Sequence, residues 1–221
     1  MKFFVNFLSA FRIAAAFAII ATLMDSMYIT SFILFIIAAL TDFFDGLLAR
    51  KYNVCSKLGG VMDHIGDKLL VVNTFIMLCV MTPIFVATFP MWGGALALKS
   101  ATFPIYGIVI PVIIMVAREL YVSGLREFLG TQKIEMPVPK ARFSMGKIKT
   151  TFQMIAIVLL LMFFAGLNLL SIYPTTSIIM IRIIRLAPYC GIISLWLALI
   201  ASIWSATQYT INFVQKLKKI K

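Results

Sequence analysis

Half of the acidic residues in this chain lie within one short segment, and their types and spacing favour a shared metal site. The 221-residue sequence has eight aspartates and glutamates, and four of them are Asp42, Asp45, Asp63 and Asp67. The surrounding sequence is apolar enough to lie in a bilayer, where a buried carboxylate is costly unless it is paired or binds a cation. A hard cation such as Mg²⁺ takes oxygen ligands and commonly brings a phosphate group with it.

Helical spacing arranges these carboxylates as two pairs. At about 100° per residue, Asp42 and Asp45 share one face of a helix, and so do Asp63 and Asp67. Two such helices facing each other can hold two cations about 4 Å apart, which suits a displacement at phosphorus. Helix capping accounts for one or two of these acids at most. The other alternative is pairing with nearby bases, which are Lys51, Lys57 and Lys68.

Small residues and an arginine accompany the two pairs. Gly46 and Ala49 share the face of the first pair, and Gly59 precedes the second pair by one turn. Small side chains there leave room for a ligand or another backbone to come close. Arg50 follows at the expected membrane edge, where a guanidinium can bind phosphate through two parallel hydrogen bonds.

The rest of the chain has the composition of a membrane protein. It is 62% hydrophobic with a mean hydropathy of +1.03, whereas a soluble domain is about 45–50% apolar. Apolar runs of about 20 residues recur, and each is long enough to span a bilayer. We expect one all-α integral membrane domain over residues 1–221, a bundle of six transmembrane helices. The expected spans are 8–24, 28–50, 61–82, 101–125, 150–170 and 187–212.

The basic residues predict the orientation of these spans. The net charge is +12, and lysine and arginine gather after the second span, between the fourth and fifth spans, and near residue 221. Such clusters mark cytoplasmic loops that meet anionic lipid headgroups, so we expect both termini and the site to face the cytoplasm. Arg182 and Arg185 fall in the expected outer loop, where they can snorkel to the headgroups. Nucleic acid is not an expected partner, because no binding motif accompanies the charge.

The acidic segment carries a family resemblance. Residues 42–67 follow the pattern Asp-x2-Asp-Gly-x2-Ala-Arg-x8-Gly-x3-Asp-x3-Asp, which resembles the signature of the CDP-alcohol phosphatidyltransferases at every defined position. Members of that family are six-helix membrane enzymes, usually homodimers. The resemblance implies transfer of a phosphatidyl group from CDP-diacylglycerol to an alcohol, with release of CMP. It also implies two divalent cations, Mg²⁺ or Mn²⁺, as cofactors.

The resemblance implies a role for each signature residue. The four aspartates would be the metal ligands, and Asp67 would also be the general base on the acceptor hydroxyl. Four residues would border the CDP moiety, namely Gly46, Ala49, Arg50 and Gly59. Many relatives have proline and alanine where this chain has His64 and Gly66. We expect His64, the only histidine, to support the site or an interface, because it lies off the face of Asp63 and Asp67.

A second set of cations indicates an anionic acceptor. Arg118 and Arg126 are eight residues apart, about 80° around a helix, so both can face one cavity. An arginine within an apolar span marks a functional site by default, and pairing with the neighbouring glutamates is the alternative. Lys147 and Lys149 are either phosphate contacts or ordinary loop charges.

Arg118, Lys147 and Lys149 lie in strings that resemble those of the family members whose acceptor is sn-glycerol 3-phosphate. The strings cover residues 117–119, 146–154 and 6–12, and the acceptor region would be about 118–153. The resemblance implies that the acceptor phosphate is bound by Arg12, Arg118, Arg126, Lys147 and Lys149.

Three alternatives stay open at this point. The first is an enzyme of the same family that uses serine, an inositol phosphate or phosphatidylglycerol. The second is an intramembrane prenyltransferase, which usually has different aspartate clusters and a larger bundle. The third, a cation transporter, is disfavoured because the acids adjoin Arg50 and Lys51 at helix ends, where positive charge would repel cations in transit.

Overall fold

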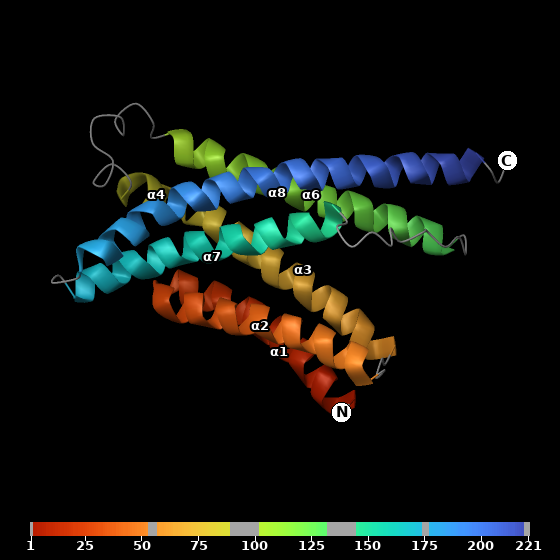
Figure 1. The fold of residues 1–221 in the computed structure, drawn as a ribbon, viewed down its shortest axis with the longest axis horizontal. Coiled ribbons are helices and arrows are strands. Elements are labelled where there is room, and N and C mark those ends of the chain that lie inside the picture. Colours follow the sequence, from red (N-terminus) through yellow and green to blue (C-terminus); the bar gives the residue numbers. More distant parts are fainter. Residues whose placement is uncertain (1, 53–56, 89–101, 132–144, 174–176, 219–221) are drawn as a thin grey trace.

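The computed structural model describes residues 2–52, 57–88, 102–131, 145–173 and 177–218, and these ranges form helices joined by short turns (Figure 1). Within these ranges the side chains at several helix ends lie outside the described part. They belong to residues 2–6, 42–52, 57–61, 63–64, 86–88, 102–105, 129–131, 145 and 216–218.

Each of the six expected spans falls mainly on a long helix, but the third, 61–82, runs past a helix end at Val80, and residue 101 of the fourth lies outside the described residues. The helices of the described ranges are α1 (Lys2–Met24), α2 (Tyr28–Tyr52), α3 (Lys57–Val80), α4 (Thr82–Thr88), α6 (Thr102–Thr131), α7 (Met145–Ile172) and α8 (Ile178–Lys218). In the described residues, four helices are long and apolar enough to cross a membrane, which makes the chain a multi-pass membrane protein. Those four stretches are Phe7–Met24, Tyr106–Phe128, Gly146–Ile172 and Ile178–Gln215.

The placement of Arg182 and Arg185 in a loop was wrong. Helix α8 begins at Ile178 and is 41 residues long, so both arginines lie in its first turns. They are exposed, while Ile184 between them is buried against α7 at Gly166. This packing extends the helix toward its N-terminus despite Pro188, a residue that normally interrupts or bends a helix. Figure 1 shows the first part of α8 inclined to the remainder.

The helices form two groups that meet along α2 and α3. Helix α1 packs against both α2 and α3, and α8 packs against both α7 and α6. Contacts of α2 with α7, and of α3 with α6 and α7, join the two groups (Figure 1). Helix α3 therefore has neighbours from both groups, which matters for the site.

A tight turn sets α1 against α2. Ser26 has a positive φ of 58°, and its N–H donates to the Leu23 carbonyl while the Met27 N–H donates to the Thr22 carbonyl. This pair of bonds is the Schellman ending of a helix. The chain reverses within three residues, so α2 runs back along α1.

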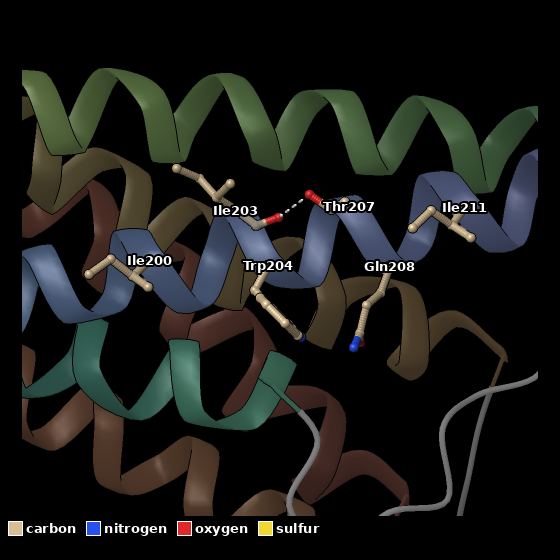
Figure 2. Close-up of a pocket in the computed structure, with 6 residues that line it drawn as sticks. All are labelled: Ile200, Ile203, Trp204, Thr207, Gln208 and Ile211. Atoms are coloured by element: carbon tan, nitrogen blue, oxygen red, sulfur yellow. Dashed lines mark hydrogen bonds between the residues drawn. The ribbon is translucent and has the colours of Figure 1, made fainter.

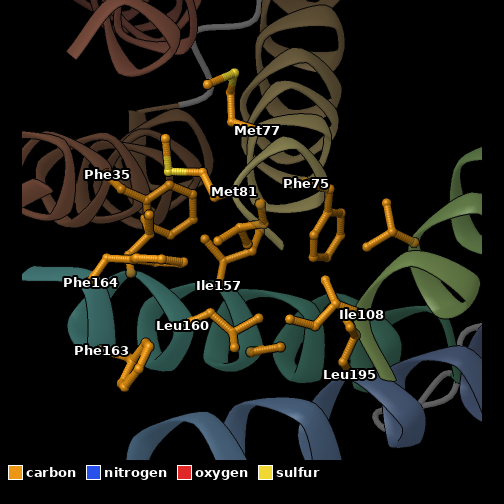
Figure 3. Packing of buried hydrophobic residues seen from close by; sticks show 14 of the residues in the cluster. Phe35, Phe75, Met77, Met81, Ile108, Ile157, Leu160, Phe163, Phe164 and Leu195 are labelled. Atoms are coloured by element: carbon orange, nitrogen blue, oxygen red, sulfur yellow. The ribbon is translucent and has the colours of Figure 1, made fainter. Parts of the chain in front are cut away.

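The apolar core joins the two groups from within. Figure 3 shows side chains of α2, α3, α7 and α8 meeting there, among them Phe35, Phe75, Leu160 and Leu195. The rings of Phe85 and Phe163 lie 5.0 Å apart in a tilted arrangement. Between helices in lipid, close packing drives association because hydrocarbon tails are as apolar as leucine.

We expect substitution by alanine to change the free energy of unfolding in opposite directions at two helical glycines, Gly166 and Gly124. A Cβ at Gly166 would lie 2.6 Å from Cγ1 of Ile184, whereas a Cβ at Gly124 would meet nothing within 4 Å. Gly166→Ala should lower the free energy of unfolding by about 1–3 kcal/mol through overpacking of α7 on α8. Gly124→Ala should raise it by up to about 1 kcal/mol through helix propensity. Denaturant unfolding in detergent measures both, and equal effects would contradict the packing described here.

Candidate active site

The signature residues lie on two successive helices. Asp42 and Asp45 belong to α2, and Asp63 and Asp67 belong to α3, with residues 53–56 between the two helices. Only Asp67 of these four has a described side chain. The facing of the two acid pairs therefore stays a prediction. The other signature side chains also lie outside the described residues, and they belong to Gly46, Ala49, Arg50, Gly59 and His64.

Asp67 accepts a hydrogen bond from Nη1 of Arg12 on α1, and the two side chains form a salt bridge. The Arg12 side chain is completely buried, while that of Asp67 is 40% exposed. A buried guanidinium needs a counter-charge, because removing an ion from water costs several kcal/mol. The pair therefore fixes the contact of α1 with α3.

Gly66 lies on α3 where that helix packs against α1. A Cβ built on Gly66 would lie 3.5 Å from Cβ of Arg12 and 3.5 Å from the carbonyl oxygen of Ser9, both ordinary contact distances. The alanine that many relatives have at this position would thus fit this packing. The departure from the family pattern at Gly66 leaves the α1–α3 contact unchanged.

Arg118 lies where α6 meets α8. Its Nε donates to the carbonyl of Ser202 over 3.1 Å, and its Nη2 donates to Oγ of Ser205 over 2.9 Å. Its Nη1 lies 3.4 Å from Oε1 of Glu119. The neighbouring glutamate is thus a weak partner, and α8 holds the guanidinium.

Lys149 and Lys68 approach the same region from α7 and α3. Lys149 forms a salt bridge with Glu119, and its side chain is only 6% exposed. Nζ of Lys68 donates to Oγ of Ser123 on α6 over 2.6 Å. Lys147 is exposed and Lys149 is buried, because two residues are about 200° apart on a helix. The structure brings Lys149 into this region and leaves Lys147 outside it.

Arg126 completes what we call the cation cluster, which consists of Lys68, Arg118, Arg126 and Lys149. Nη2 of Arg126 donates to the Tyr209 hydroxyl over 2.8 Å, and its guanidinium carbon lies 5.0 Å from the centroid of that ring.

The cluster has an excess of positive charge. Lys68 lies close enough to Arg118 and Arg126 for their charges to repel, as does Lys149 to Arg118 and Lys68. Glu119 is the one carboxylate that pairs with the cluster among the described side chains. Like charges in a partly buried site are unfavourable, so a bound anion would stabilise this arrangement. Phosphate is one of the anions that guanidinium and ammonium groups bind well.

Helix α3 connects the cluster with the signature. Asp67 meets Arg12 on α1, and the next residue, Lys68, meets Ser123 on α6. Adjacent residues on a helix point about 100° apart, so one turn of α3 serves both helix groups. Arg12, which the sequence predicted as a phosphate ligand, is brought by the structure to Asp67.

Sequence reasoning missed four residues of this region. The sequence suggested Lys68 only as a partner for the acids, and it assigned no residue of α8 a role in the site. Ser202, Ser205 and Tyr209 nevertheless stand at i, i+3 and i+7, the spacing of one helix face. A polar stripe on an otherwise apolar helix was the signal that could have found them.

A surface groove on α8 is a poor candidate for this chemistry. It has a volume of about 510 Å³ and is lined by Ile200, Ile203, Trp204, Thr207, Gln208 and Ile211. Figure 2 shows these side chains along the exposed side of α8, where Oγ1 of Thr207 donates to the Ile203 carbonyl over 3.0 Å. The lining has no charged group, so it provides no cation to neutralise a phosphate.

A double-mutant cycle measures the Arg12–Asp67 pair. We expect Arg12→Met and Asp67→Asn each to lower the free energy of unfolding, and the double variant to lose less than the sum of the two. The coupling free energy should be about 1–3 kcal/mol, as for residues in direct contact. Denaturant unfolding in detergent gives all four values, and additive losses would show that the two side chains do not interact.

Known proteins resemble this chain over most of its length. A family model described as CDP-alcohol phosphatidyltransferase matches residues 3–204. A protein of Rickettsia bellii named CDP-diacylglycerol–glycerol-3-phosphate 3-phosphatidyltransferase is 36% identical over 182 residues, which are 79% of this chain and 83% of the relative. A Cereibacter sphaeroides protein of the same name is 41% identical over 127 residues, 58% of this chain and 47% of the relative. An Arabidopsis thaliana protein, named as form 2 of that enzyme, is 37% identical over 128 residues, 58% of this chain and 49% of the relative.

Proposed function

We propose that this chain, which belongs to the CDP-alcohol phosphatidyltransferase family, transfers a phosphatidyl group from CDP-diacylglycerol to sn-glycerol 3-phosphate and releases CMP. The names of the relatives support this acceptor. The observation that carries the proposal is the cation cluster, which adjoins the signature through Lys68. An acceptor with its own phosphate would neutralise that cluster, whereas a neutral alcohol would leave the excess charge in place.

The reaction makes and breaks one bond at phosphorus. The 1-hydroxyl of glycerol 3-phosphate attacks the β-phosphorus, which bears the diacylglycerol, and the bond from this phosphorus to the CMP oxygen breaks. The hydroxyl proton passes to Asp67, directly or through a water molecule. Arg12 orients this carboxylate through their salt bridge. Positioning of the acceptor and stabilisation of charge provide most of the rate enhancement.

The signature residues would hold the donor. The family uses divalent cations, and two pairs of carboxylates on successive helices form an all-oxygen donor set that suits Mg²⁺ or Mn²⁺. We propose Asp42, Asp45, Asp63 and Asp67 as the ligands of two such ions, which when bound would neutralise the diphosphate. The CDP moiety would be bordered by Gly46, Ala49, Arg50 and Gly59.

The acceptor phosphate would be bound by the cation cluster. Arg118, Arg126 and Lys149 were predicted for this role, and the structure adds Lys68 beside them. For Lys147 we propose the role of an ordinary surface charge on α7 in place of a phosphate contact, because it is exposed. For Arg12 we propose the contact with Asp67 in place of direct phosphate binding.

We also propose a single domain of six transmembrane spans, with the site and both termini on the cytoplasmic side and a homodimer as the assembly. The order of the interhelical contacts supports this topology. Arg118 meets Ser205, Arg126 meets Tyr209, and the rings of Phe128 and Phe213 lie 5.8 Å apart, so α6 and α8 run in the same direction. Alternate helices of a six-span bundle must do so. The acyl chains of the donor and surrounding lipids would contact the apolar outer faces.

A panel of acceptors tests the activity. Purified protein in detergent, with CDP-diacylglycerol and Mg²⁺, should release CMP with glycerol 3-phosphate at least about tenfold faster than with serine, inositol phosphate or phosphatidylglycerol. One lost charge-assisted contact already corresponds to about this factor. CMP release and the mass of the lipid product are the measurements. Faster turnover with another alcohol would assign the chain to a different member of the family.

Two lysines on α7 test the acceptor site. Lys149→Met should raise the KM for glycerol 3-phosphate about tenfold to a hundredfold, because contacts to a charged group contribute about 1.5–3 kcal/mol. The KM for CDP-diacylglycerol should change by less than about threefold, since lost contacts act on the substrate that makes them. Lys147→Met is the matched control and should change neither constant. Equal effects of the two variants would argue against a phosphate site at Lys149.

A further inference from the structure

Three residues of α8, Ser202, Ser205 and Tyr209, contact the two arginines of the cation cluster. The Ser202 carbonyl and Oγ of Ser205 accept hydrogen bonds from the Arg118 guanidinium, over 3.1 and 2.9 Å. Tyr209, one turn further along, contacts Arg126 in two ways, through its hydroxyl at 2.8 Å and through its ring face at 5.0 Å. A hydrogen bond and a ring contact from one side chain fix both the position and the orientation of the guanidinium plane.

Arg126 requires such a contact more than the other cations do. Arg118 and Lys149 are largely enclosed, with side chains 10% and 6% exposed, whereas Arg126 is exposed near the end of α6. A free arginine side chain has about 2 kcal/mol of rotamer entropy, which binding of a ligand would have to offset. Contact with Tyr209 restricts the rotamers of Arg126 before the ligand binds. Binding then has less rotamer entropy to offset, which raises the affinity.

Tyr209 lies beyond the part of the chain that the family model matches. That match ends at residue 204, while Ser205 and Tyr209 follow it on the same face of α8. The contacts that hold these arginines thus come partly from residues beyond the segment that the family model matches.

We propose that Tyr209 is a positioning residue for the acceptor site, which holds the Arg126 guanidinium ready to receive the phosphate of the acceptor. The proposal rests on the proposed function, in which that acceptor is glycerol 3-phosphate. Tyr209 acts through Arg126 and does not itself touch the substrate. The Tyr209 hydroxyl accepts a hydrogen bond from Nη2 of Arg126. The opposite edge of the guanidinium would bind the phosphate of the acceptor.

The chain offers a matched control on the same pair of helices. The hydroxyl of Tyr121 on α6 lies 3.1 Å from Oγ1 of Thr210 on α8, within hydrogen-bond distance. Tyr121→Phe therefore removes one tyrosine hydroxyl from the α6–α8 contact, as Tyr209→Phe does, but without changing the partner of Arg126. Any general loosening of this contact should appear in both variants.

The experiment compares the kinetics of the full chain with these substitutions. Tyr209→Phe, which keeps the ring, should raise the KM for glycerol 3-phosphate about threefold to tenfold, the effect of one hydrogen bond. Tyr209→Leu removes the ring as well and should raise it further. Inhibition by inorganic phosphate should weaken in parallel. The KM for CDP-diacylglycerol and the melting temperature should match those of Tyr121→Phe.

The dependence on Arg126 distinguishes positioning from a structural role. In an Arg126→Met background, Tyr209→Phe should have no further effect on the KM for glycerol 3-phosphate. The proposal is overturned if Tyr209→Phe leaves that KM unchanged, shifts both KM values equally, or acts as strongly without Arg126. A wild-type protein that does not use glycerol 3-phosphate would refute the proposed function as well, so the two failures are distinguishable.

Discussion

Charge inside an apolar bundle is the constraint on which this structure depends. A guanidinium or ammonium group taken out of water must meet an opposite charge or several hydrogen-bond acceptors, or it destabilises the fold. Arg12 meets Asp67, Lys149 meets Glu119, and Arg118 is held by the serines of α8. Each of these contacts joins different helices. The polar layer therefore determines which helices are neighbours as much as the apolar core does.

Among the described side chains this layer is incompletely neutralised, and this property connects stability with function. If every cation had its own carboxylate, the bundle would be more stable alone but would have no use for an anion. The described part of the chain provides one carboxylate, Glu119, for the four cations of the cluster. Glu119 holds Lys149 in place, and the remaining charge makes phosphate a favourable ligand. Positive charge beside a phosphoryl-transfer site also favours the acceptor that carries a phosphate over neutral alcohols.

In the proposed function, helix α3 brings donor chemistry and acceptor binding together. Asp67 contacts Arg12 on α1 and Lys68 contacts Ser123 on α6, so adjacent residues would serve the reacting hydroxyl and the phosphate of the same acceptor. A rigid helix keeps these two groups at a constant separation, which is how positioning contributes to catalysis. Gly66 lies at the contact of α3 with α1, where an added Cβ would meet Arg12 and Ser9 at ordinary contact distances of 3.5 Å.

The sequence by itself determined the helical class, the expected spans and the signature over residues 42–67, because hydropathy and helical spacing are local properties. It also indicated Arg118, Arg126 and Lys149 from charge within or beside apolar spans. Only the tertiary structure decided which partners these charges have. Arg12 and Asp67 are 55 residues apart, and Arg118 and Ser205 are 87 apart, so no local pattern pairs them. The role of α8 depended on its packing against α6, and the start of α8 at Ile178 depended on Ile184 packing against Gly166.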